Sequence, residues 1–419
     1  MIEKNSYFVE KIYPFLSTLL IIFLTDSLLF STSDISILNT ARKIVPLILA
    51  VLLFISSFGK KNISAPLFLI CVSILISMLF GIGEVTKGAA YITQISLLLF
   101  AYEYSKTISF HKFSNAYIII MRIIAIVSLV GFFFRGIIVN ISFIPTIHTG
   151  GSLYYKTLFF TNLPINNSYG RRNFGPFWEP GAFQFYLNIA LLFTLMRNKK
   201  YWVFDTILFL GTAITTFSGA ALVPMPFVFL AFLLNKNGAR AKLNIIALGL
   251  LMLVGIFILY QYGVLDSIIN KLNGTNNESY SVRMGSLIGN LKSTFINPFF
   301  GISPDQQYLI RGQETQALSG IYYEGNTNTF SGLFASFGIF VGLYYLYRGY
   351  MFTYNFTNKI YVKLLILISL ILATSNEEFG QSITFHTLLF IGGFSLLDRK
   401  ASETVNTNEN VFSCLPNTI

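Results

Sequence analysis

Charged residues, cysteine and histidine are all scarce in this chain of 419 residues. Only 11% of the residues are Asp, Glu, Lys or Arg, whereas a soluble protein would carry roughly a quarter. The two cysteines, Cys71 and Cys414, fall in an apolar segment and in the C-terminal tail, which leaves no disulfide framework or CxxC metal site. The histidines (His111, His148 and His386) lie in unrelated segments, and no phosphate-binding loop or dinucleotide fingerprint is present. We therefore expect a protein that uses no metal and no cofactor.

Long hydrophobic runs are abundant instead. Apolar residues make up 54% of the chain and the mean hydropathy is +0.64. They recur in blocks of about 15 to 22 residues, the length at which a helix crosses a hydrocarbon core of roughly 30 Å. This pattern predicts an all-α polytopic integral membrane protein of about 12 transmembrane helices, with 10–12 as the range because Pro224 and Pro226 weaken one span. The predicted spans are 12–30, 44–58, 64–80, 89–104, 116–134, 182–196, 201–217, 220–234, 243–262, 329–347, 364–375 and 383–397.

The distribution of Lys and Arg predicts the orientation of these spans. Short loops rich in Lys and Arg stay in the cytoplasm, and most of the 29 such residues fall in alternate connections. Both termini are then cytoplasmic, and the net charge of +11 reflects topology and gives no reason to expect a nucleic acid partner. In one membrane domain, the predicted parts are N-terminal helices 1–134, a first extracytoplasmic loop 135–181, central helices 182–262, a second extracytoplasmic loop 263–328, C-terminal helices 329–397 and a cytoplasmic tail 398–419.

The first long loop ends in a cluster of polar and aromatic residues, RRNFGPFWEPG. Arg171, Arg172, Trp178 and Glu179 come just before a span that starts near Pro180. Proline suits the first turn of a helix, and a glutamate there favours its positive end. A purely structural explanation is therefore open: a helix-end charge, an interfacial tryptophan and arginines that contact lipid headgroups. The other explanation is a functional site, since loops on rigid scaffolds often carry one.

The second long loop begins as an amphipathic helix, which we expect to lie on the membrane surface. Arg283, Ser286 and Asn290 share its polar face, and Asn297-Pro298 ends it because a residue before proline is pushed out of the helical region. Arg283 is either a basic surface charge near lipid phosphates or part of a site. The apolar positions at helical spacing are Met284, Leu287, Ile288, Leu291 and Phe295.

A series of short motifs follows from the first long loop to the span after the second. They are Arg172 with Gly175, Glu179-Pro180, the turn 216–219, Ser281 with Arg283, Pro298 with Gly301, and Thr327-Asn328 ahead of Gly338 and Gly342. Their order resembles the superfamily of O-antigen ligases and Wzy-type O-antigen or capsule polysaccharide polymerases, over about residues 171–343. Ligases of that superfamily commonly have His-Asn where this chain has Thr327-Asn328, which argues against a ligase. The FWEPG segment resembles the polymerases.

The resemblance implies a metal-independent, GT-C-like glycosyltransferase at the outer face of a bacterial inner membrane. Such an enzyme transfers a growing glycan from undecaprenyl diphosphate to another lipid-linked repeat unit. The implied partners are undecaprenyl-diphosphate-linked oligosaccharides, membrane lipids and a chain-length regulator. Two other functions stay open: an O-antigen ligase, and a lipid-linked oligosaccharide flippase or transporter, although the internal repeats common in transporters are not evident.

The expected chemistry assigns roles to the loop residues. Arginine donates parallel hydrogen bonds to phosphate and keeps its charge near lipid, so Arg172 and Arg283 are expected to hold the diphosphate. Glu179 is expected to accept the proton of the acceptor hydroxyl, and burial would tune its pKa towards neutrality. Glu324 and Asp305 are the reserve candidates for this base. The residues expected to bind substrate are Arg171, Trp178, Arg311, Glu324, Thr327 and Asn328.

Other ionisable residues near the spans have structural explanations. Arg122 is expected to extend to the membrane interface. Glu377 and Glu378 fall in a predicted outer turn, where we expect them to be exposed to solvent. His386 lies one turn into a span and is expected to hydrogen-bond a neighbouring helix.

Overall fold

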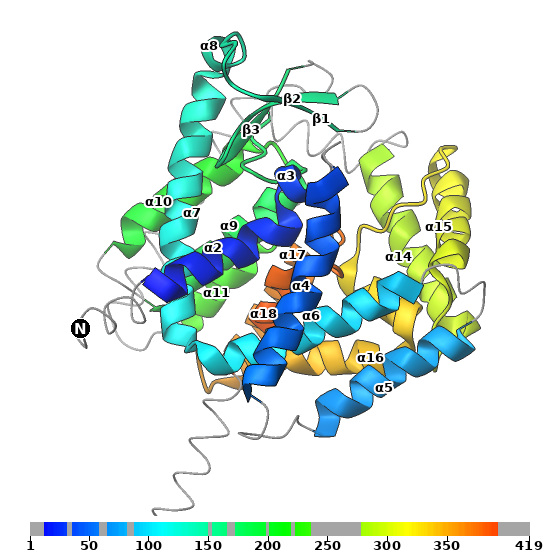
Figure 1. The fold of residues 1–419 in the computed structure, drawn as a ribbon. Helices are drawn as coiled ribbons and strands as arrows, with labels where there is room; N and C mark the ends of the chain where they lie inside the picture. The colour runs from blue at the N-terminus through cyan, green and yellow to red at the C-terminus, as the bar shows by residue number, and fades with distance from the viewer. Residues whose placement is uncertain are drawn as a thin grey trace, which may run out of the picture.

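The computed structural model describes residues 12–31, 36–57, 65–81, 88–149, 153–165, 172–197, 201–218, 223–235 and 278–392. This part is mostly helical, with one small sheet at the end of the body where α7 finishes (Figure 1). Arg171, the predicted span 243–262 and the tail 398–419 lie outside the described residues. The helices are α2 Tyr13–Asp26, α3 Leu28–Ser31, α4 Ser36–Ser57, α5 Ala65–Phe80, α6 Gly88–Thr107, α7 Phe110–Phe133, α8 Arg135–Ile138, α9 Pro180–Arg197, α10 Trp202–Thr215, α11 Met225–Asn235, α14 Glu278–Ile296, α15 Pro304–Ser319, α16 Thr329–Thr353, α17 Ile360–Ala373 and α18 Ile383–Phe390.

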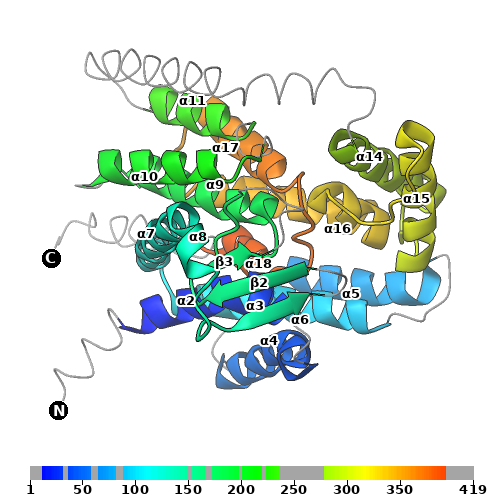
Figure 2. The ribbon, with the colours of Figure 1, turned by 90° about the horizontal axis from the view of Figure 1, so that it is seen from above.

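A helix lies at every predicted span that falls within the described residues. Among the described residues, two helices, α7 and α16, are long and apolar enough to cross a membrane. The fold is therefore compatible with a membrane protein. The helices do not all run in one direction: α7 is upright in Figure 1 and end-on in Figure 2, whereas α5 and α6 lie across it.

The first predicted span is divided. Helix α2 ends at Asp26, and Ser27 is extended and forms a bridge with Phe177. The Leu28 N–H donates to the Pro176 carbonyl at 2.9 Å. The break therefore fastens the N-terminal helices to the segment just before Glu179.

The expectation of an all-α chain is wrong for the first long loop. Strands β1 Thr146–Thr149, β2 Leu153–Leu158 and β3 Thr161–Pro164 form an antiparallel sheet in the order β1-β2-β3. The strands are rich in threonine and tyrosine, which favour pleated surfaces, but each is too short to give a clear alternation in the sequence. The Asn162 N–H donates to the Gly175 carbonyl at 2.7 Å, so the sheet also holds the segment that leads to Glu179.

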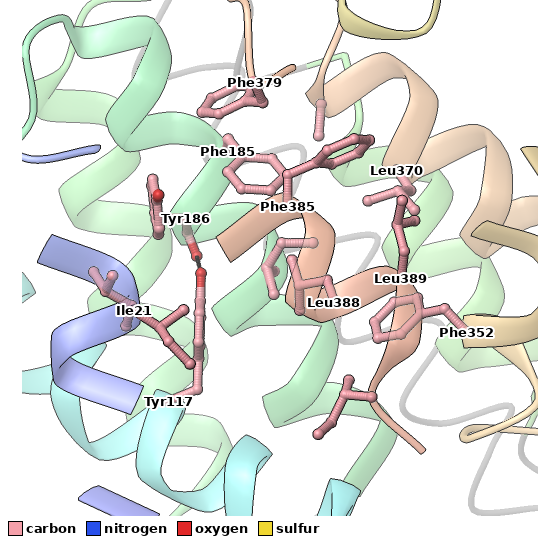
Figure 3. Close-up of a cluster of buried hydrophobic side chains, with 14 of the residues drawn as sticks. Ile21, Tyr117, Phe185, Tyr186, Phe352, Leu370, Phe379, Phe385, Leu388 and Leu389 are labelled. Carbon is pink, nitrogen blue, oxygen red and sulfur yellow. Dashed lines mark hydrogen bonds between the residues drawn. The ribbon is translucent and has the colours of Figure 1, made fainter. Parts of the chain in front are cut away.

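Helix α9 is the centre of the core. Its residues from Pro180 to Leu195 are all buried, as expected for a helix that is apolar on every side. Phe185 and Tyr186 of α9 pack near Phe385 and Leu388 of α18, with Phe379 next to Phe185 (Figure 3). The central position of α9 places the residue before it, Glu179, at a junction of several helices.

Candidate functional site

Glu179 stands immediately before α9, which begins at Pro180 as the sequence predicts. Glu179 is exposed, whereas Pro180 and Gly181 are buried. The first amide groups of a helix have no partner within the helix and carry partial positive charge. A carboxylate here is therefore stabilised where it can also reach solvent.

A second glutamate, Glu377, reaches the same helix end from the turn between α17 and α18. A Cβ atom added at Gly181 would overlap its Oε1 and lie 3.2 Å from its carboxyl carbon. The Glu377 carboxyl group shares a hydrogen bond with Glu179 and accepts one from the Trp178 indole, and it feels the charge of Arg283. The side chains of Trp178, Glu179 and Glu377 therefore lie together at the start of α9, and Arg283 is close enough for its charge to act on Glu377.

Burial and the Glu179 charge raise the pKa of Glu377 well above its ordinary value of 4.5. The positive charge of Arg283 and the Trp178 hydrogen bond act in the opposite direction. Two carboxyl groups in hydrogen-bond contact cannot both ionise without a large penalty. We therefore assign the proton of the pair to Glu377, which is the less exposed residue.

This assignment predicts how thermal stability depends on pH. As pH rises from 4.5, the unfolded chain releases the Glu377 proton while the folded chain retains it, so stability falls until the folded pKa is reached. In Glu377→Gln the side chain is neutral throughout. We expect the melting temperature of the wild type, relative to this variant, to fall as pH rises above 4.5. A thermal melt in matched detergent measures it, and a constant difference between the two proteins would refute the raised pKa.

The turn that carries Glu377 is fixed by the first residue of α16. The Thr329 hydroxyl donates to the Glu377 carbonyl at 3.0 Å and accepts from the Phe379 N–H at 2.8 Å. The Phe379 ring lies 4.3 Å from Phe185 and 5.9 Å from Trp178, measured between centroids. The Glu377 carboxyl group is therefore held against α9 by both hydrogen bonds and aromatic packing.

Arg283 comes from α14, whose end at Ile296 agrees with the predicted stop before Pro298. The predicted polar face turns inwards: Ser286 and Asn290 are buried and donate to Asn326 Oδ1 at 3.1 and 3.0 Å. The apolar residues Leu291 and Phe295 are exposed. The helix thus presents apolar side chains outwards, as a membrane-contacting helix would, and keeps its polar face for the interior.

Thr327 and Asn328 have structural contacts. The Asn328 side chain caps α16 by accepting from the Ser331 N–H at 3.0 Å. The Thr327 N–H donates to the Ser286 hydroxyl at 3.0 Å. Capping of α16 explains the asparagine, and the hydrogen bond to α14 explains how Thr327 is held. Neither contact requires a substrate.

Arg172 makes a side-chain hydrogen bond to the end of α10. Its Nε donates to the Thr216 carbonyl at 3.1 Å, and the next residue, Asn173, donates to Thr215 Oγ1 at 2.9 Å. The segment is thereby fastened to the end of α10. Gly175 then turns at φ +54° against the Phe183 ring, which explains the glycine of this motif.

Arg311 and Glu324 belong to the second long loop, in which the structure adds the unpredicted helix α15. The Arg311 Nε donates to the Glu324 carbonyl at 2.9 Å, so Glu324 contributes its backbone, and its side chain is exposed. Asp305 lies in the first turn of α15, a common place for an acidic residue. Tyr323 is close to both Arg311 and the carboxyl pair. Burial raises the pKa of its hydroxyl, and so do the charges of Glu179, Glu377 and Glu378, whereas the charge of Arg311 lowers it.

Three expectations about ionisable residues have different outcomes. Glu377 is half-buried and not fully exposed as expected, because its carboxyl group packs against Gly181 of α9; Glu378 is exposed as expected. Arg122 pairs with Asp205 through Nε at 2.7 Å and Nη2 at 2.8 Å, so an unforeseen partner in α10 replaces the predicted extension to the interface. His386 hydrogen-bonds Gln94 of α6 and Tyr345 of α16, which confirms the expected interhelical contact.

No group of three or more His, Cys, Asp or Glu residues suited to a metal ion occurs within the described ranges. Comparison with protein-family models finds no match, and comparisons with curated proteins and with solved structures find none either. The structure thus defines a mostly helical protein, compatible with membrane association, that has a carboxyl pair at the start of its central helix and an arginine whose charge acts on that pair.

Proposed function

We propose that this chain is a Wzy-type polysaccharide polymerase of a bacterial inner membrane. It transfers a growing glycan from undecaprenyl diphosphate to another lipid-linked repeat unit. The observation that carries this proposal is that Glu179 hydrogen-bonds Glu377 while Arg283 is close enough for its charge to lower the pKa of the same carboxyl group. Glu179 and Arg283 lie in separate loops, each within a motif that resembles the same superfamily. Nothing in their sequence spacing requires them to be close.

The proposed reaction uses the site as follows. Ionised Glu179 accepts the proton of the acceptor hydroxyl as that oxygen forms the new glycosidic bond. The bond between the donor sugar and its diphosphate breaks, and the electron pair leaves on undecaprenyl diphosphate. Arg283 stabilises the negative charge that develops on the leaving oxygen. Glu377 stays protonated and hydrogen-bonds Glu179, which fixes the orientation of the base. One base is enough for a displacement with inversion.

The proposed topology has about 12 spans and places the loops 135–181 and 263–328 outside the inner membrane. It supports the reaction because lipid-linked repeat units are joined on that side. The exposed apolar residues of α14 supply a surface where lipid tails could approach the site. Thr327, in place of the ligase histidine, favours polymerisation over ligation.

Arg283 gives the direct cellular test. In a strain that lacks the chromosomal copy, we expect Arg283→Gln to shorten the surface-polysaccharide ladder on a gel towards a single repeat unit. A lost hydrogen bond to a charged group is worth about 1.5–3 kcal/mol, or roughly a 10- to 150-fold lower rate. Arg283→Lys should recover part of the ladder because it keeps the positive charge.

Lys292→Gln is the matched control, since Lys292 lies on the same helix but is exposed and pairs with Glu314. Its ladder should have full length at equal membrane abundance. A full ladder in Arg283→Gln would contradict the proposed site. Loss of even the single repeat unit would point to a ligase or a flippase instead.

A further inference from the structure

A small cavity lies beside the carboxyl pair and has a volume of about 140 Å³. Its walls come from α6, α15, α16 and the turn after α17. Glu378 lines it, next in sequence to Glu377, and so does Thr329, which holds the Glu377 turn. The cavity is therefore adjacent to the proposed reaction centre and opens beside the same loop.

Arg311 supplies a fixed hydrogen-bond donor to this cavity. The residue is only 2% exposed. Its Nε donates to the Glu324 carbonyl, and its Nη1 donates to Asn290 Oδ1 and Gln307 Oε1, both at 3.1 Å. These bonds leave the hydrogens of Nη2 without a partner among the described residues. The guanidinium group is thus held rigid with one donor nitrogen left for a ligand.

Gln94 supplies a fixed acceptor on the α6 wall of the cavity. Its Nε2 donates to the Tyr345 hydroxyl at 2.5 Å and contacts His386 Nε2 at 2.9 Å. The His386 Nδ1 faces the Ser382 carbonyl at 2.7 Å, so it carries the ring proton and leaves Nε2 as an acceptor. The Gln94 Nε2 faces these two groups, and its Oε1 is the atom left to accept from a ligand in the cavity.

Aromatic rings complete the lining. Tyr91 and Phe337 line the cavity and pack edge to face, with centroids 5.6 Å apart. Tyr308 also lines it and lies under the Arg311 guanidinium at 5.1 Å. Rings beside a set of polar groups can cover the C–H face of a sugar while the polar groups bond its hydroxyls.

We propose that this cavity binds one uncharged sugar ring of a lipid-linked glycan next to the reacting carboxyl pair. The inference rests on the proposed function and adds a substrate subsite to it. Arg311 would donate to a sugar hydroxyl, and Gln94 and Glu378 would accept from others. The volume equals about five water molecules at roughly 30 Å³ each, so the cavity takes the hydroxyl-bearing edge of one ring and leaves the rest of the ring outside it.

The charges favour a hydroxyl ligand over a phosphate. Arg311 and Glu378 both line the cavity, so their opposite charges offset each other and Glu378 would repel an anion. Only one nitrogen of Arg311 is left to donate, whereas phosphate binding by arginine typically uses two parallel hydrogen bonds. A sugar needs both donors and acceptors, and the cavity offers both.

The test is ligand binding by the purified full-length protein, measured by saturation-transfer NMR. The probes are methyl glycosides of the monosaccharides in the surface polysaccharide of the source strain. We expect at least one to bind the wild type and the exposed control Lys292→Gln, and to bind at least about tenfold more weakly to Arg311→Gln, a loss of about 1.4 kcal/mol or more. Glu378→Gln changes an exposed residue, so it should weaken binding without loss of folding.

Three results would overturn the inference: no glycoside binds, all four proteins bind equally, or inorganic phosphate displaces the glycoside competitively at equal concentration. Because the readout is binding, it is independent of polymerase activity. Glycoside binding together with unimpaired polysaccharide in Arg283→Gln would retain the sugar cavity and reject the proposed function. A ladder shortened towards a single repeat unit in Arg283→Gln, with no glycoside binding, would retain the proposed function and reject the sugar cavity.

Discussion

Glu179→Gln should reduce the rate of glycan polymerisation by about 100-fold or more, whereas Glu377→Gln should retain the rate to within about tenfold. Removal of a general base typically costs 10²–10⁴ in rate. The difference between the two variants arises because Glu377 holds the proton of the pair. Glutamine at position 377 is also neutral and can donate a hydrogen bond to Glu179, so the base stays in place. Glutamine at position 179 cannot accept the proton.

The measurement is the rate of chain extension in membranes that contain equal amounts of each variant. Glu314→Gln is the matched control, because Glu314 pairs with Lys292 on the outer side of α14 and α15. Its rate should equal that of the wild type. The reverse pattern, with Glu377→Gln inactive and Glu179→Gln active, would identify Glu377 as the general base. Equal activity in both variants would reject the carboxyl pair as a reaction centre.

Gly338→Ala should destabilise the folded protein by at least about 2 kcal/mol, the scale of strain from an unfavourable backbone conformation. Gly338 interrupts α16 with φ +80° and ψ 179°, and a Cβ atom there would overlap the Phe299 carbonyl. The turn after α14 packs into this break: the Ile339 N–H donates to the Pro298 carbonyl at 2.7 Å. Gly301 completes the turn at φ +71°.

A thermal melt of the detergent-solubilised protein measures this effect as a lower melting temperature. Gly211→Ala is the control, because a Cβ atom at Gly211 in α10 meets nothing within 4 Å. Alanine there should be neutral or stabilising by up to about 1 kcal/mol, since it favours helix. Equal melting temperatures for the Gly338 and Gly211 variants would show that the break in α16 does not depend on glycine.

Most of the described helices follow directly from the sequence, because apolar blocks of span length are a strong signal. The polar helix α15 does not. The start of α9 at Pro180 and the end of α14 before Pro298 were also predictable, since proline has a defined place at both boundaries. The division at Ser27 and the break at Gly338 were not. Both depend on segments far away in the sequence, at Phe177 and Phe299.

The candidate site was predictable only in part for the same reason. Glu179 and Arg283 stood out because each follows a recognisable loop pattern. Glu377 sits in a turn, NEEF, in which two glutamates look alike. Only the packing of the turn on α9 distinguishes Glu377, whose carboxyl group packs against Gly181, from Glu378, which lines the cavity. No local pattern in the sequence carries that information.

Reconstitution of the purified protein in liposomes with its lipid-linked repeat unit tests the central claim most directly. Mass spectrometry of the products should show glycans that grow by whole repeat units and remain attached to undecaprenyl diphosphate. One undecaprenyl diphosphate should be released for each unit added, and Glu179→Gln should give neither product. Repeat units that stay single, or that cross the bilayer without being joined, would contradict the assignment of this chain as a polymerase.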